Sequence, residues 1–121
     1  MMRLAATFAV TLAAGSALAE PFGCDFTVEC IAGEACGATS FSARIIAADH
    51  EAQLFLSTVT GESPVIRLTE AGALPATYAS AGRDGLAEMM TIEGDLTALL
   101  TVHVFDGTAQ TVTYFGTCEA L

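Results

Sequence analysis

The chain has 121 residues and carries 14 aspartates and glutamates against four arginines and no lysine, a formal net charge of −10 at pH 7. This balance argues against binding to nucleic acid or to an anionic membrane surface, because both are bound chiefly through lysine and arginine. It favours a cationic partner, with solubility through mutual repulsion as the simpler alternative. The length suits a single domain with one core.

The first segment, residues 1–19, is typical of a secretory signal peptide. Arg3 provides a short positive start, residues 4–14 are apolar, and Ala17-Leu18-Ala19 forms a small-residue cleavage pattern. A membrane anchor is the alternative, but the apolar stretch is shorter than the roughly 20 residues needed to cross a bilayer. We therefore expect cleavage after this segment.

The mature protein is expected to be one domain over residues 20–121. Its charge becomes −11, because three arginines remain against fourteen carboxylates once the signal peptide is removed. No later stretch is long and apolar enough to span a membrane, so no membrane insertion is expected after cleavage. Abundant alanine and the absence of asparagine indicate a bacterial source. Periplasmic or secreted localisation follows as an expectation.

All four cysteines lie in the mature part, and an even number in a small exported chain indicates two disulfides. Four cysteines allow three pairings. We expect Cys24 with Cys118 and Cys30 with Cys36, because Cys24 opens the first predicted strand and Cys118 closes the last. A zinc or redox site is disfavoured, because the chain has no C-x-x-C motif and its histidines lack finger-like spacing.

Alternating apolar and polar residues, separated by turn signals, predict about eight short strands. The strands are expected at residues 24–30, 39–47, 53–59, 65–68, 74–80, 86–92, 96–105 and 109–118. In the first of them, Cys24, Phe26, Val28 and Cys30 are expected to face the core. Asp106-Gly107 is a strong signal for a hairpin between the last two strands.

This pattern predicts an all-β fold, an antiparallel meander that closes or nearly closes into a barrel stapled by its disulfides. A bridge between the first and last strands would protect edges that otherwise promote aggregation. A two-sheet sandwich is the alternative. Because side chains just fill an eight-stranded barrel, we expect a packed core without a large ligand cavity.

One candidate binding site lies in the glycine-flanked segment Ser80-Ala81-Gly82-Arg83-Asp84-Gly85, which is predicted to form a projecting loop. The candidate contact residues are Ser80, Arg83 and Asp84, with a solvated turn as the alternative. In size, export, terminal cysteines and this short Ser/Gly loop, the chain resembles the periplasmic lysozyme inhibitors of the membrane-bound C-type class. The resemblance implies a small barrel whose loop enters the cleft of a basic enzyme. The lysine and the aromatic residue expected beside that loop are absent here.

A second candidate site is the turn Asp49-His50-Glu51, where two carboxylates and an imidazole could converge on Zn²⁺ or Cu²⁺. A solvated polar turn is the alternative. Met89-Met90 offers soft ligands for Cu(I), but neighbours in a strand face opposite sides. We therefore expect one methionine in the core and the other on the surface. His103 is expected on the outer face of its strand.

No motif for a nucleophile, a catalytic metal or a cofactor occurs in the chain, so we expect neither an enzyme nor a bound cofactor. The leading hypothesis is a small exported β-domain that binds or inhibits a cationic envelope protein. A metal or small-ligand binding protein and a structural envelope protein are the alternatives.

Overall fold

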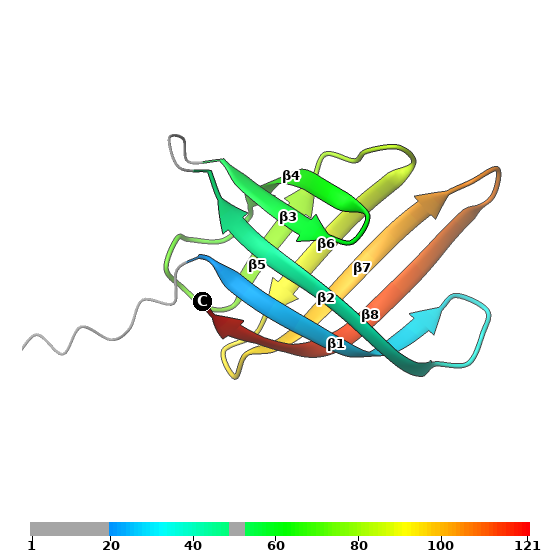
Figure 1. Cartoon of the computed structure of the whole chain (residues 1–121), viewed down its shortest axis with the longest axis horizontal. Coiled ribbons are helices and arrows are strands. Elements are labelled where there is room, and N and C mark those ends of the chain that lie inside the picture. The colour runs from blue at the N-terminus through cyan, green and yellow to red at the C-terminus, as the bar shows by residue number, and fades with distance from the viewer. Residues whose placement is uncertain (1–19, 49–52) are drawn as a thin grey trace, which may run out of the picture.

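The computed structural model describes residues 20–48 and 53–121, which form eight antiparallel strands closed into a barrel (Figure 1). Each strand pairs with its neighbours in sequence, and the last pairs back with the first. The strands are β1 (Phe22–Ile31), β2 (Gly37–Ala47), β3 (Leu54–Thr58), β4 (Gly61–Arg67), β5 (Ala76–Ser80), β6 (Leu86–Ile92), β7 (Thr97–Phe105) and β8 (Ala109–Ala120). The predicted all-β barrel is confirmed, and the sandwich alternative is not adopted.

The core lies inside the barrel and is made by every second residue of each strand, as expected where one face of a strand is buried. The largest fully buried side chains are Tyr78, Phe22, Phe26, Ile45, Leu56, Met90, Ile92 and Leu100. Met90 is buried, whereas its neighbour Met89 is 49% exposed on the outer face. The predicted division of the two methionines between core and surface is therefore confirmed.

The expectation that Val28 and Cys30 face the core is wrong. Val28 is 38% exposed, and Cys30 is only half-buried. The cause is a β-bulge between Phe26 and Val28, which shifts the pairing of β1 with both β2 and β8. An extra residue reverses the faces of all residues that follow, because side chains alternate with a period of two. Val28 consequently pairs with Phe115 on the outside of the barrel.

Gly116 provides the close approach of β1 and β8 beside this bulge. A Cβ at Gly116 would lie 2.6 Å from the Cα of Phe26 and against the carbonyl oxygen of Asp25. We expect Gly116→Ala to lower the free energy of unfolding by roughly 1–3 kcal/mol, measured by urea denaturation, because backbone must move to admit the methyl group. Gly37→Ala is the control, since a Cβ at Gly37 meets nothing within 4 Å. Equal stability of the two variants would contradict the prediction.

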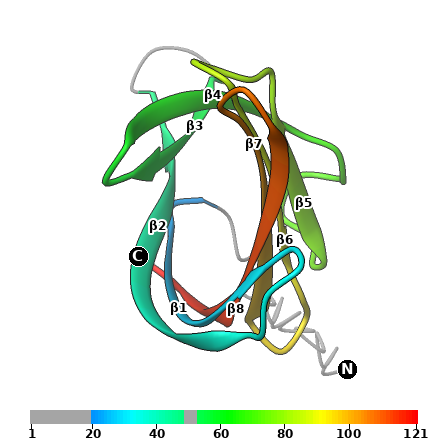
Figure 2. The ribbon, with the colours of Figure 1, turned by 90° about the vertical axis from the view of Figure 1, so that its right-hand side faces the viewer.

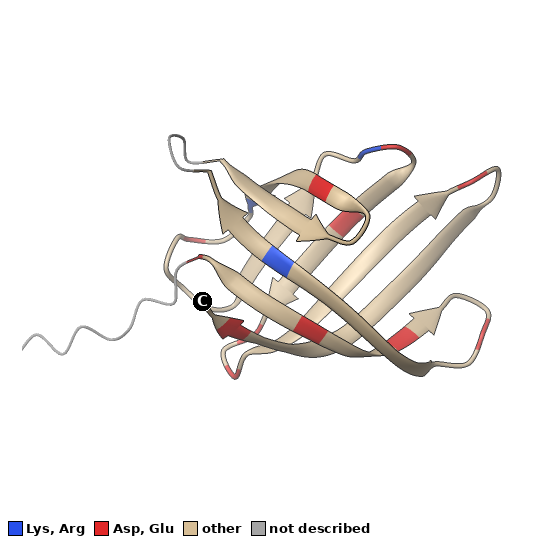
Figure 3. Cartoon of the chain, viewed as in Figure 1, with Lys and Arg blue, Asp and Glu red and all other residues tan. Residues whose placement is uncertain are grey.

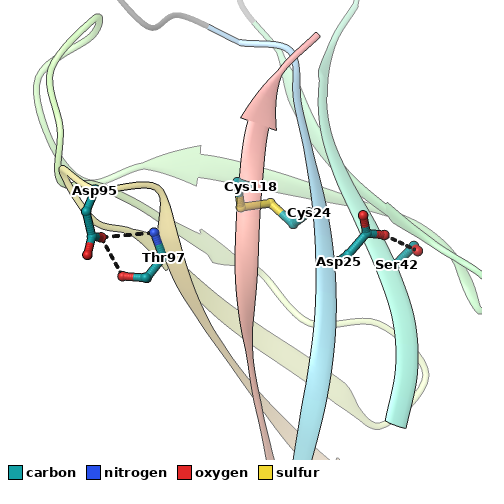
Figure 4. The surroundings of a disulfide bond; sticks show 6 residues. All are labelled: Cys24, Asp25, Ser42, Asp95, Thr97 and Cys118. Atoms are coloured by element: carbon teal, nitrogen blue, oxygen red, sulfur yellow. Dashed lines mark hydrogen bonds between the residues drawn. A yellow bond between two sulfur atoms is a disulfide. The ribbon is translucent and has the colours of Figure 1, made fainter.

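Both predicted disulfides are confirmed. Cys24–Cys118 joins β1 to β8 and closes the barrel (Figure 4), whereas Cys30–Cys36 closes the connection between β1 and β2. Disulfides of this kind persist in oxidising compartments, so they indicate folding outside the cytoplasm. Within residues 20–48 and 53–121, no helix is long and apolar enough to cross a membrane. The predicted signal peptide, residues 1–19, lies outside the described residues.

One end of the barrel, which we call the closed end, is sealed by a polar network around Glu20. Tyr78 of β5 is buried, and its hydroxyl donates a hydrogen bond of 2.5 Å to the Glu20 carboxylate. Arg67 of β4 forms an ion pair with the same carboxylate, and its guanidinium also donates to the carbonyl oxygen of Ala73 at 2.7 Å. The guanidinium carbon lies 5.5 Å from the centre of the Tyr78 ring. The network therefore fastens Glu20, which lies just before β1, to β4 and β5.

Candidate binding site

An apolar cavity of about 140 Å³ lies at the opposite end of the barrel, which we call the open end. The connections β1–β2, β3–β4, β5–β6 and β7–β8 surround this end, which faces the viewer in Figure 2. The aliphatic walls come from β6, β7 and β8 and consist of Leu86, Leu100, Val102, Val104 and Val112. An apolar cavity of about 150 Å³ holds one benzene molecule. The cavity thus has room for one small group, as expected for a barrel without a large ligand chamber.

Two stacked aromatic rings form part of the cavity lining. Phe41 of β2 and Tyr114 of β8 stack with ring centres 4.7 Å apart, and Phe26 packs against both from the core. Burial raises the pKa of Tyr114 to about 12, helped by a hydrogen bond to Glu29 and by the negative charge of that residue. The phenol therefore stays neutral at physiological pH. Neutral aromatic faces of this kind attract cations.

Glu88 is the one charged side chain in the cavity wall. It lies on β6 and is only 9% exposed. Its carboxylate accepts a hydrogen bond of 3.2 Å from the hydroxyl of Ser63 on β4. Across residues 20–48 and 53–121, no basic side chain approaches this carboxylate within 4 Å. A buried carboxylate normally has a cationic partner, because removing an ion from water costs several kcal/mol.

Arg83, the basic residue of the predicted binding loop, reaches the Glu88 site through Ser63. Its Nε donates to the Ser63 hydroxyl at 3.3 Å, and its Nη2 donates to the carbonyl oxygen of Thr60 at 3.1 Å. A third contact places Nη1 3.6 Å from the carboxylate of Asp84. Arg83 therefore folds back onto the β3–β4 hairpin rather than projecting, whereas Asp84 is 84% exposed at the side chain.

The structure brings two of the three candidate loop residues next to Glu88. The Ser80 hydroxyl accepts a hydrogen bond of 2.8 Å from the backbone N–H of Glu88, and Arg83 is linked to the Glu88 carboxylate through Ser63. Asp84 points away from the cavity into solvent. Ser80, Arg83 and Asp84 therefore lie at the rim of the open end, and their contact with a partner stays a prediction.

Sequence reasoning did not identify Glu88 or Ser63 as site residues. A signal exists for Glu88, because it is an acidic residue on the core-facing side of the alternating segment Leu86–Ile92. No comparable signal exists for Ser63. Its role depends on the curvature that brings β4 and β6 together across the barrel, and the sequence pattern does not contain this information.

The predicted metal site at Asp49, His50 and Glu51 lies outside the described residues and stays a prediction. In the part of the chain that the structure describes, no three side chains among His, Cys, Asp and Glu gather in a way that could hold a metal ion. His103 is exposed on the outer face of β7, as expected. Met89 and Met90 face opposite sides of β6, so they do not form a thioether pair.

Acidic residues, red along the ribbon in Figure 3, occupy connections and strand ends at the open end. The connections and strand ends at the open end carry Glu29, Glu34, Glu62, Asp84 and Asp106. Among the described residues of this end, Arg83 is the sole arginine, and the chain has no lysine. A cleft lined by one sign of charge raises the local concentration of ions of the opposite sign and accelerates their association.

Comparisons of the chain with protein-family models, with curated proteins and with solved structures found no match. The fold and the site define a small, disulfide-closed β-barrel with one sealed end and one open, acidic end.

Proposed function

We propose that this protein is a periplasmic or secreted binder of a cationic envelope protein, and that the open end of the barrel is its binding face. The observation that carries the proposal is the Glu88 carboxylate, which lies in the wall of an open apolar cavity and has no basic side chain of residues 20–48 or 53–121 within 4 Å. Five further carboxylates surround the same opening. A basic partner would neutralise this charge on docking.

Covalent and hydrogen bonds restrain the β1–β2 and β5–β6 connections at the rim of the open end, which favours its use as a binding surface. The Cys30–Cys36 disulfide restrains the β1–β2 connection. In the β5–β6 connection, Arg83 and Leu86 exchange two backbone hydrogen bonds of 2.7 Å, and the guanidinium of Arg83 ties this connection to the β3–β4 hairpin. Loops that are already ordered lose little conformational entropy when a partner binds.

The charge distribution predicts that partner binding weakens as salt rises. The test is an affinity pull-down from periplasm with the mature protein, residues 20–121, at about 50 mM and about 500 mM salt, since added ions screen exposed charges. We expect a basic protein such as a lysozyme to be captured at low salt and largely lost at high salt. Recovery of no basic protein at low ionic strength would overturn the proposal. A lysozyme activity assay with the purified protein then distinguishes inhibition from binding.

A further inference from the structure

We infer that the cavity at the open end is a receptor for one primary ammonium group, the end of a lysine side chain. The identification of that lysine as part of a cationic protein rests on the proposed function. The chemistry of the cavity itself is independent of that proposal, and it can be tested with a small amine.

The pairing of β6, β7 and β8 arranges the cavity in layers. Leu86 pairs with Val104 nearest the mouth, and Glu88 pairs with Val102 in the next layer. Leu100 and Tyr114 form the layer below. A group that enters the cavity therefore passes apolar side chains before it reaches the carboxylate. This order matches a lysine side chain, which has a flexible hydrocarbon stem and a charged end.

The chemistry of the carboxylate favours ammonium over guanidinium. Oε1 of Glu88 already accepts the hydrogen bond from Ser63, so an arginine making paired contacts would have to share that oxygen with the Ser63 hydroxyl. Ammonium is a compact charge that needs only one strong acceptor, and it gains further from the aromatic faces of Phe41 and Tyr114. The small volume of about 140 Å³ also suits the slimmer side chain.

Arg83 does not fill the place beside the Glu88 carboxylate that the ammonium group would take. Its guanidinium contacts Ser63 and the carbonyl oxygen of Thr60, and Asp84 lies 3.6 Å from it. Asp84 offsets part of the positive charge that would otherwise repel an incoming ammonium. The Ser63 hydroxyl accepts from Arg83 and donates to Glu88, so it holds the carboxylate in place.

The test is a titration of the oxidised mature protein with n-butylammonium chloride, followed by two-dimensional amide NMR. 1-Butanol, which has the same stem without the charge, is the matched ligand. We expect saturable shifts at Glu88, Leu100 and Tyr114, and at least about tenfold tighter binding of the amine, because a hydrogen bond to a charged group contributes this much. Glu88→Gln should remove that tenfold preference.

The control variant is Glu93→Gln, which removes an exposed charge from the β6–β7 connection at the closed end and leaves the cavity unchanged. It should bind butylammonium as the wild type does. Equal binding of amine and alcohol by the wild type, or a preference for the amine that survives Glu88→Gln, would overturn the inference. Thermal unfolding shows whether each variant is folded. If Glu88→Gln is unfolded, the second variant is Glu88→Asp, which carries its carboxylate on a shorter side chain.

The same variant separates the inference from the proposed function. A basic protein captured equally by wild type and Glu88→Gln would support a cationic partner and refute the assignment of a lysine of that partner to the cavity. Saturable, Glu88-dependent amine binding without any captured basic protein would support the receptor and refute the cationic protein partner.

Discussion

Replacement of Cys24 and Cys118 by alanine is expected to lower the free energy of unfolding of the barrel, residues 20–121, by about 4.7 kcal/mol. The two cysteines are 94 residues apart in sequence, so their bond removes a large amount of conformational entropy from the unfolded chain. A small domain has a total stability of only about 5–15 kcal/mol. The melting temperature, followed by circular dichroism, should fall by roughly 20 °C or more.

The matched control is the alanine pair at Cys30 and Cys36. These residues are 6 apart in sequence, and the same relation gives about 2.4 kcal/mol for the shorter loop. The first pair also joins the strands that close the barrel, whereas the second restrains one connection. Equal losses for the two variants, or a larger loss at Cys30 and Cys36, would contradict the prediction.

Arg67→Met is expected to lower the free energy of unfolding by about 3–5 kcal/mol, because removal of one partner leaves a buried charge uncompensated. The Arg67 and Glu20 side chains are 9% and 13% exposed. Among the described residues, the variant would leave the Glu20 carboxylate with Tyr78 as its one side-chain partner. The guanidinium contacts with the β4–β5 connection would also be lost.

Urea denaturation at pH 7 measures this change. Arg44→Met is the matched control, because Arg44 is exposed on β2 and surface substitutions of this kind change stability by about 0.5 kcal/mol or less. A loss at Arg67 no larger than that at Arg44 would show that the network at the closed end contributes little to stability.

The closed end also predicts a dependence on acid. Burial raises the pKa of Glu20, but the hydrogen bond from Tyr78 and the charge and hydrogen bond of Arg67 outweigh it, so the pKa lies below its usual value. A carboxylate with a lowered pKa adds stability above the pKa of the unfolded chain, about 4.3, and this is lost as pH falls through the folded-state pKa. Unfolding measured between pH 7 and pH 2 should therefore show a smaller acid-dependent loss in Arg67→Met than in the wild type.

The period-two pattern predicts the strands well. Successive residues of a strand point alternately to the core and to solvent wherever one face of a sheet is buried, so their polarity alternates as well. The bulge in β1 is the exception. Nothing in the segment from Phe26 to Val28 marks an extra residue, and the shift is set by simultaneous pairing with β2 and β8. Val28 is consequently on the outer face, although the alternation alone places it inside.

The candidate site, like the strands, was predicted from the sequence only in part. The Ser/Gly loop identifies Ser80 and Arg83, which do lie at the rim, because glycines mark turns through local backbone geometry. The side-chain contacts of this loop, in contrast, are made with residues far away in the sequence. Arg83 folds back because the β3–β4 hairpin offers Thr60 and Ser63, about twenty residues earlier in the chain.

The amino-acid sequence by itself determined the all-β class, the strand order and the acidic charge, since these depend on periodicity, turn residues and composition. It also indicated the disulfide pairing, because a meander that closes places its first and last strands side by side. Tertiary structure alone decided the bulge, the sealed end at Glu20 and the cavity at Glu88. Each of these depends on segments far apart in the sequence that meet only when the barrel curves and closes, and no local pattern encodes such a meeting.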